Sequence, residues 1–424
     1  MKILVVSNTP WSVDNSFGNS FTNIFEGIDD VQFVNVYCRY GTPNNQFDMK
    51  CFQITEKMLL ANLLCKQTPS GKIIEKNCNE SFPDATAVIG FEHARKARWQ
   101  IMFWARDLIW KIGRWDSREL KRFINDNKPD LIFQPIYYSN YICRIALRIS
   151  EMVDVPMIGY ISDDCYTLRQ FKISPMYWID RLIKRRNVKA LIEKCRLLYV
   201  ISEIQKREYE QIFSPPCKIL TKVNTFDKEP PTWNVSEDIS MIYAGNLGNG
   251  RAKSLGHICK AVARLKTEGK RIHLDIYSNT PLTYVNARRL RKEGCTFHPA
   301  IPYKDLLEKQ KMTDILVHVE GLSLKSRFET HQSFSTKLVD FFSMGKCVFA
   351  VGKDDEASIA HLLKNDAAVV AMTKKEVYQK LKQLVCNPDE IIRYGIKAYE
   401  CGRKNHRKDV VQTMLIEDLK GLIK

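Results

Sequence analysis

The stretch SFSTKLVDFFSMGKCVFAV, residues 333–351, places three hydroxyl side chains and a lysine before an apolar segment with a helical pattern. Serine and threonine cap helices by accepting from free backbone N–H groups, and that end of a helix carries a partial positive charge. We therefore expect Ser335 or Thr336 to cap a helix, with Lys337 beside an anion site and Asp340 one turn further along. An ordinary capped helix with an exposed aspartate is the alternative.

Strand-like apolar runs alternate with longer helical patterns along the whole chain. The runs are KILVVS, VQFVNVY, DLIFQP, PMIGYIS and LLYVIS in the first half, and SMIYAG, IHLDIYS, DILVHVE, CVFAVG and AAVVA in the second. This alternation is typical of βαβ units and of parallel sheets that are covered on both faces. It predicts an α/β fold with two Rossmann-like, doubly wound domains.

The chain has 424 residues, which is long enough for two domains with separate cores. Residues 222–239 contain two adjacent prolines and little apolar periodicity, as expected of a linker. We predict a first domain over residues 1–222, a linker over 223–238 and a second domain over 239–404. Ligands of doubly wound sheets bind beyond the carboxyl ends of the strands, which places the site in the cleft between the domains.

The formal net charge of +17 will attract polyanions, whether nucleic acid, acidic lipid or phosphorylated small molecules. Thirteen cysteines without CxxC or Cys/His spacing favour a reducing compartment over a disulfide framework. No run approaches the roughly 20 apolar residues of a spanning helix, and the apolar run at the N-terminus is too short for a signal peptide. We expect a cytoplasmic protein that is soluble or peripheral at the inner face of the membrane.

A second candidate site follows the strand ISMIYAG, which runs into the turn NLGNGRAKSL. Gly245, Gly248 and Gly250 would let the backbone approach a ligand, and Arg251 and Lys253 at a helix start suit a pyrophosphate. A merely structural turn is the alternative. This turn and the stretch at 333–351 would reach the same cleft, and both suit an anionic nucleotide.

With these two sites in this order, the chain resembles the GT-B glycosyltransferases of family four. Their donor-binding segment has a small or hydroxyl residue, Lys-Leu, an acid, an aromatic and then Gly-Lys-Pro-Val, as STKLVDFFSMGKCVFAV does in part. LLYVISEIQKREYEQIF resembles the end of the family's first domain and MIYAGNLG the start of its donor domain. FHPAIPYKDLLEKQKMTDILVHVE resembles the segment around the base pocket. NHRKDVVQTMLIEDLKGLI resembles the C-terminal helix that crosses back, so residues 405–424 would complete the first domain.

The resemblance implies an enzyme that moves a sugar from a nucleotide-diphosphate sugar to a carbohydrate or lipid-linked acceptor, in cell-surface polysaccharide biosynthesis. It implies no cofactor and no metal, because cations and the helix dipole would stabilise charge on the departing diphosphate. Asp340 would contact the ribose, and Arg251 and Lys337 would act catalytically. The donor-binding residues carried over are Gly245, Asn246, Gly248, Arg251, Lys253, Ile301, Ser333, Ser335, Thr336, Lys337 and Asp340.

The chain departs from the family at one pair of acids. Many members carry two glutamates eight positions apart, whereas here Asp340 replaces the second and Gln332 stands eight residues before it. Glu320 and Glu329 are nearby but out of register. The sugar-contacting role, and with it retention or inversion, stays open.

The acceptor should be held by loops of the first domain. The turn at residues 7–21 has the glycine and small polar residues expected at the end of the first strand. Asp163 and Asp164 directly follow another strand, where a carboxylate could orient or deprotonate an acceptor hydroxyl. A solvated loop is the alternative for these acids. We predict Asp163 as a catalytic residue and acceptor contacts at Asn8, Gly18, His93 and Asp163.

Residues 92–115, EHARKARWQIMFWARDLIWKIGRW, hold four of the seven tryptophans. On a helical wheel one stripe contains Trp99, Phe103 and Trp110, and another contains Trp104, Leu108, Ile112 and Trp115. Cations lie beside both stripes, which suits a helix at an anionic membrane surface; they are Arg95, Arg98, Arg106, Lys111 and Arg114. Packing in a groove between neighbouring elements is the alternative.

Two rival functions fit parts of the sequence. A sugar-nucleotide epimerase shares the architecture, but the motif around Lys337 and Asp340 favours transfer. A basic nucleic-acid-binding protein would explain the charge, but the aromatics form no RNA-binding signature, so we expect no nucleic-acid partner. The donor base, the sugar, the acceptor and the oligomeric state are not encoded in these patterns.

Overall fold

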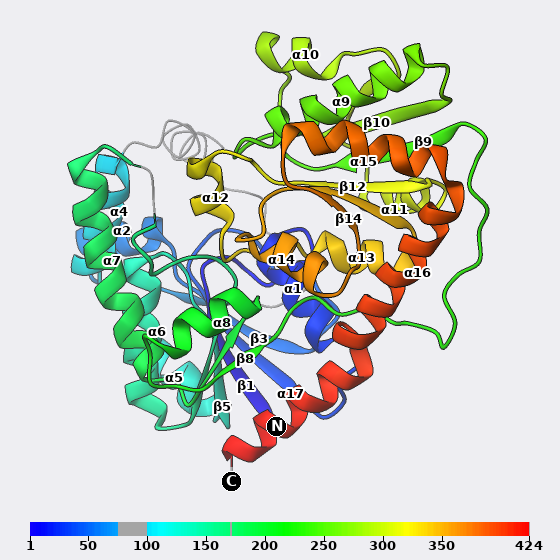
Figure 1. Cartoon of the computed structure of the whole chain (residues 1–424). Helices are drawn as coiled ribbons and strands as arrows, with labels where there is room; N and C mark the ends of the chain where they lie inside the picture. The colour runs from blue at the N-terminus through cyan, green and yellow to red at the C-terminus, as the bar shows by residue number, and fades with distance from the viewer. Residues whose placement is uncertain (75–99, 170–171, 424) are drawn as a thin grey trace.

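The computed structural model describes residues 1–74, 100–169 and 172–423, and it forms two α/β domains around two separate sheets (Figure 1). The first sheet has the order β4-β3-β2-β1-β5-β6-β7-β8 and is parallel except for β4, which runs antiparallel to β3. Its strands are β1 (Lys2–Ser7), β2 (Gln32–Tyr37), β3 (Met49–Gln53), β4 (Lys72–Ile74), β5 (Leu131–Pro135), β6 (Met157–Ile161), β7 (Leu197–Val200) and β8 (Cys217–Ile219).

Helices cover both faces of this first sheet, so its central strands are apolar on both sides. In β1, which lies between β2 and β5, the side chains of Ile3, Leu4, Val5 and Val6 have no exposed area. The helices are α1 (Ser16–Phe25), α2 (Glu56–Leu64), α4 (Gln100–Ile112), α5 (Arg118–Asn127), α6 (Asn140–Val153), α7 (Pro175–Glu193) and α8 (Glu203–Glu210).

The second sheet is wholly parallel in the order β11-β10-β9-β12-β13-β14. Its strands are β9 (Ile239–Ala244), β10 (Ile272–Ser278), β11 (Cys295–Pro299), β12 (Ile315–Val319), β13 (Cys347–Val351) and β14 (Val369–Ala371). Its helices are α9 (Arg251–Thr267), α10 (Tyr284–Leu290), α11 (Tyr303–Lys311), α12 (Leu324–Thr330), α13 (Lys337–Met344), α14 (Ala357–Lys364), α15 (Lys374–Cys386) and α16 (Pro388–Asn405). The predicted α/β class with two Rossmann-like sheets is confirmed.

The last helix, α17 (Lys408–Ile423), leaves the second domain and packs against the first (Figure 1). Leu415 and Leu419 are fully buried in the same cluster as Trp11 and Phe21. The hydroxyl of Tyr199 in β7 donates to Asp418 at 2.7 Å, which fixes the helix against the sheet. The chain therefore crosses between the domains twice, once in the segment after β8 and once between α16 and α17.

The tryptophan-rich segment is packed into the first domain over its described part. Trp110 has no exposed area, stacks on Tyr141 with ring centroids 4.6 Å apart and donates to Glu56. Trp104 donates to Asp180 of α7 at 3.3 Å, and Trp115 donates to the Trp110 carbonyl at 3.1 Å. Trp110 cannot lie at a membrane surface, because its side chain is fully buried, whereas Leu108 and Ile112 of the same segment are each 55% exposed. Membrane contact of the rest of the segment stays a prediction. Residues 92–99, with His93, Arg95, Arg98 and Trp99, lie outside the described residues.

Within the described ranges, no helix is both long enough and apolar enough to span a bilayer.

Candidate functional site

The candidate site lies where β9 and β12 of the second domain end, beside the first turn of α13. A pocket of about 240 Å³ is lined there by Gly245, Asn246, Arg251, His318, Glu320 and residues 333–337. Parallel strands deliver their carboxyl ends to one edge of the sheet, which is why residues far apart in sequence meet there.

The glycine turn after β9 makes room for this pocket. Gly250 has a φ of 80°, in the left-handed region that favours glycine, and a Cβ there would collide with Ser326. A Cβ on Gly245 would lie 3.0 Å from the Lys337 Nζ and 3.0 Å from the Tyr243 hydroxyl. Gly245 therefore lets the Lys337 side chain reach the end of β9.

Among the described residues, the Lys337 Nζ has one hydrogen bond, to the Ala244 carbonyl oxygen at 2.8 Å. Burial lowers the pKa of Lys337, as does the nearby Arg251 guanidinium, while Glu320 and Asp340 oppose the change. A bound anion would replace part of the lost hydration of this ammonium group.

Arg251, the first residue of α9, makes a paired contact with Glu320. Its Nε and Nη2 lie 3.1 and 2.9 Å from Oε2 of Glu320, and its Nη1 donates to Asn246 at 3.0 Å. Burial raises the pKa of Glu320, and the Arg251 charge acts against that rise. His318, one of whose nitrogens lies 3.5 Å from Glu320, has its pKa lowered to about 3, chiefly by burial. The histidine is therefore neutral at physiological pH, and Lys337 supplies the unbalanced positive charge.

The start of α13 differs from the expected cap. Thr336 occupies the N-cap position, but no side-chain hydrogen bond caps the helix. The backbone N–H of Ser335 donates instead to the Ser358 hydroxyl at 2.9 Å. The prediction that a hydroxyl of Ser335 or Thr336 caps the helix is therefore wrong. The backbone N–H groups of Leu338 and Val339 donate to the carbonyls of Ser335 and Thr336, so the helix end offers an anion chiefly its partial positive charge.

The first domain contributes Asp163, which follows β6 and faces the pocket across the cleft. The Ser333 hydroxyl donates to the Asp163 carboxylate at 3.1 Å, so the two predicted residues meet. The neighbouring Asp164 has a different role: it accepts from the backbone of Tyr166 and Thr167, and Arg181 lies 3.2 Å away. Asp164 thus holds its own loop, and Asp163 is left exposed.

Gln332, which stands where many family members have a glutamate, joins the two domains. Its Nε2 donates to Glu208 of α8 at 2.6 Å, and its carbonyl accepts from Ser202 at 2.8 Å. Although burial acts in the opposite direction, hydrogen bonds from His331, Arg169 and Gln332 lower the pKa of Glu208. The Gln332 side chain is buried and engaged in this contact.

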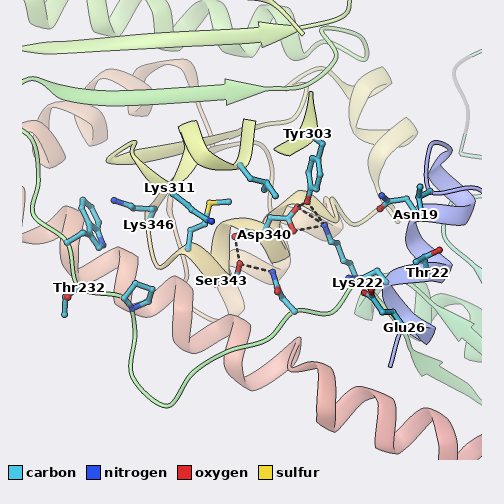
Figure 2. A pocket seen from close by; sticks show the side chains of 17 residues that line it. Asn19, Thr22, Glu26, Lys222, Thr232, Tyr303, Lys311, Asp340, Ser343 and Lys346 are labelled. Atoms are coloured by element: carbon cyan, nitrogen blue, oxygen red, sulfur yellow. Dashed lines mark hydrogen bonds and ion pairs between the residues drawn. The ribbon is translucent and has the colours of Figure 1, made fainter. Parts of the chain in front are cut away.

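Asp340 faces a second, larger cavity of about 660 Å³ between α1, the interdomain linker, α11 and α13. Its carboxylate oxygens lie 2.6 and 2.9 Å from the Nζ of Lys222, and the Tyr303 hydroxyl donates at 3.0 Å (Figure 2). The Lys222 charge comes from the end of the first domain. The structure therefore places Asp340 next to the pocket of Lys337 and Arg251 on α13, but not in it.

Several predicted residues lie elsewhere. Lys253 and Gly248 are exposed and do not line the pocket. Ile301 packs against the apolar cluster under α13. Asn8 accepts from the Tyr141 hydroxyl, and Gly18 is buried where a Cβ would overlap Ser12. The roles predicted for Asn8 and Gly18 in acceptor binding are unsupported by these contacts.

Glu320 was not among the predicted site residues. Its signal was its position directly after the apolar run of β12, at the same sheet edge as Gly245. The contacts of Lys222 and Tyr303 with Asp340 could not be predicted in this way, because neither residue directly follows a recognisable sequence motif.

Neither protein-family models nor curated proteins give a match to the sequence. Solved structures do resemble the fold. Sucrose-phosphate synthase from Thermosynechococcus elongatus superposes with a TM-score of 0.60 at 11% identity, over 100% of this chain and 99% of that one. HepE of Anabaena, solved with UDP, gives 0.63 at 10% identity over 100% of both chains. An α,α-trehalose-phosphate synthase from Burkholderia vietnamiensis gives 0.56 at 9% identity over 99% and 100%. The likeness extends over whole chains and confirms the predicted arrangement, the GT-B fold of two Rossmann-like domains facing a cleft.

Proposed function

We propose that this protein is a glycosyltransferase that moves a sugar from a nucleotide-diphosphate sugar to a carbohydrate or lipid-linked acceptor. The observation that carries the proposal is the meeting of Arg251, Lys337 and the uncapped start of α13 in one pocket opposite Asp163. Solved neighbours of the same fold support it, since HepE was crystallised with UDP and with UDP and glucose.

The pocket suits a reaction in which a diphosphate leaves. Negative charge grows on the departing phosphate oxygens, and preorganised cations stabilise that charge more than they stabilise the bound donor. Lys337 would act here through its ammonium group, and Arg251 through the guanidinium face that Glu320 does not occupy. Glu320 orients Arg251 and does not need to touch the donor.

Asp163 would hold or deprotonate the acceptor hydroxyl. It lies on the other domain, within hydrogen-bond distance of Ser333 on the rim of the donor pocket. An acceptor that replaces Ser333 as the donor to Asp163 would enter beside the sugar. Asp340 would accept from the ribose with the lone pairs that Lys222 and Tyr303 leave unused.

Binding and product analysis test the proposal. Nucleoside diphosphates with each base should be screened by thermal shift, since a ligand that binds only the folded state raises the melting temperature. The matching sugar nucleotide should then yield a glycosylated product only when an acceptor is added. An altered sugar nucleotide formed without acceptor would support a sugar-nucleotide epimerase instead. Salt-dependent binding of nucleic acid, without binding of nucleotides, would support a nucleic-acid-binding protein.

We also propose that the first domain contacts an anionic membrane surface, where a lipid-linked acceptor would be found. Helix α7 supports this contact, because its Ile179, Leu182 and Ile183 side chains are each about half exposed. Arg186 and Lys189 follow on the same exposed face. Apolar side chains followed by cations suit the headgroup region of an acidic bilayer.

A further inference from the structure

His318 is a buried histidine in the donor pocket, and the proposed reaction gives it no contact. It lies on β12, between β9 and β13, and its side chain lines the pocket that holds Lys337 and Arg251. The residue is 7% exposed, and its Nε2 is buried without a hydrogen-bond partner among the described residues. A buried polar atom that lacks a partner destabilises a folded protein, so such atoms are rare and call for a physical reason.

Glu320 offers a matching free oxygen beside this histidine. Residues two apart in a strand point to the same face of the sheet, which brings the two side chains together. Stabilising the leaving group requires only that Glu320 orient Arg251, which it does through Oε2. In the described ranges no group donates a hydrogen bond to its Oε1. The His318 Nε2 lies 3.5 Å from this oxygen, too far for a good N–H···O hydrogen bond.

The charge state of the two side chains determines what they can bind. The pKa of His318 is lowered to about 3, chiefly by burial and further by the Arg251 and Lys337 charges, so the ring is neutral. A neutral imidazole carries one N–H, and the nearby carboxylate favours the tautomer with this proton on Nε2. The His318 Nε2 is then a free hydrogen-bond donor, and the Glu320 Oε1 is a free acceptor.

A hydroxyl group fits this donor and acceptor better than a phosphate does. A hydroxyl can accept from the His318 Nε2 and donate to the Glu320 Oε1 at the same time. A phosphate oxygen could also accept from Nε2, but the negative charge on Oε1 would repel it. Arg251 binds the other oxygen of the same carboxylate, so the hydroxyl would lie next to the diphosphate, where the donor carries its sugar.

We propose that His318 and Glu320 bind one hydroxyl group of the sugar that the donor carries, and that they select donors with a hydroxyl at that position. The inference rests on the proposed function, because it places the sugar in the pocket of Lys337 and Arg251. A site that is built to bond a hydroxyl rejects an analogue without it, since the buried polar groups of the site then stay unpaired.

Calorimetric titrations with UDP and with its glucose, galactose and N-acetylglucosamine esters test the proposal. For the ester that binds most tightly, His318→Leu should reduce the affinity about tenfold, whereas the affinity for UDP should stay within about twofold. His318→Gln keeps an N–H near the position of Nε2, so it should retain most of the affinity for the ester. If the nucleotide screen selects another base, the diphosphate and hexose esters of that base replace these probes.

His273→Leu is the matched control. His273 lies on β10 of the same sheet, pairs with Asp238 and does not line the pocket, so its loss should change neither affinity. His318→Leu removes a buried polar atom without a partner, and its melting temperature without ligand should therefore not fall below that of the wild type.

Equal affinity of His318→Leu and the wild type for every ester would overturn the proposal. An equal loss of affinity for UDP and for the ester would place His318 against the phosphates and would overturn it as well. If no nucleoside diphosphate binds the wild type, the proposed function itself fails and this inference falls with it. That outcome differs from the first two, in which the nucleotide still binds.

Monodeoxy forms of the tightest ester give a second measurement that does not depend on the folding of a variant. One of them should bind the wild type about tenfold more weakly than the parent ester, because it lacks the hydroxyl that the pair contacts. His318→Leu should bind that form and the parent with similar affinity. If every monodeoxy form binds the wild type as tightly as the parent does, no hydroxyl is selected and the proposal is wrong.

Discussion

Replacing Asp340 with alanine should destabilise the protein, because it leaves the Lys222 charge partly buried and without its carboxylate. The side chains of Lys222 and Asp340 are 13% and 9% exposed, and two contacts of 2.6 and 2.9 Å join them. Removing one partner of such a pair typically costs about 3 to 5 kcal/mol. Because both groups keep some contact with solvent, we expect about 3 kcal/mol. For a domain of about 200 residues, a loss of about 3 kcal/mol corresponds to a fall in melting temperature of about 6 to 12 °C.

The double variant Asp340→Ala with Lys222→Met separates the ion pair from ligand binding. It removes both charges, so it should recover most of the stability, with a coupling energy of about 2 to 3 kcal/mol between the sites. Its affinity for the nucleoside diphosphate should still fall by about 1.5 to 3 kcal/mol, the value of a hydrogen bond to a charged group. Urea denaturation and calorimetry measure the two effects. If Asp340→Ala is as stable as the wild type, the ion-pair argument is refuted; if the double variant binds like the wild type, Asp340 does not contact the ribose.

Three further predictions follow from the site, the buried histidines and α7. Arg251→Ala and Lys337→Ala should slow transfer more than they weaken donor binding, and equal losses would contradict a role in stabilising the leaving group. Burial is the main cause that lowers the pKa of His361 to about 4 and that of His406 to about 3. At a pH below the ordinary histidine pKa of about 6.5, the unfolded chain therefore binds more protons than the folded protein. The free energy of unfolding should then fall by about 2 kcal/mol per histidine between pH 7 and pH 5, and urea titrations of His406→Asn should show a flatter dependence. Serine in place of the exposed apolar residues of α7 should reduce sedimentation with anionic liposomes while donor binding survives, and undiminished sedimentation would place the contact elsewhere; the residues are Ile179, Leu182 and Ile183.

The central strands could be predicted because they are apolar on both faces. β1 and β13 are buried at nearly every position, and their apolar runs stand out in the sequence. β11 was missed because it is an edge strand, paired only with β10, and its residues CTFHP are at most half-buried. β3 was missed for its mixed composition, MKCFQ, in which a lysine interrupts the apolar side chains. Edge position explains the composition of β11 but not that of β3, which lies between β2 and β4. It depends on the order of the strands and cannot be read from one segment alone.

Helix geometry explains why one of two predicted cations reached the pocket. Arg251 and Lys253 are two residues apart at the start of α9, and residues at that spacing point to different sides of a helix. Arg251 turns toward Glu320, so Lys253 is left in solvent. This difference follows from the sequence once the helix start is known. The contact between Lys222 and Asp340 could not be predicted from the sequence, because 118 positions separate the two residues and only the packing of the domains joins them.

The departure from the family at residue 332 follows from the contact between the domains. Glu208 already accepts from His331 and Gln332 and pairs with Arg169, so its carboxylate is the negative centre of this junction. A glutamate at 332 would set a second carboxylate against it at the 2.6 Å now spanned by an amide hydrogen bond. Two carboxylates sharing a site cannot both ionise without cost, whereas an amide donates to one. Glutamine at 332 therefore suits domain docking, which leaves Glu320 as the buried acid among the pocket's cations.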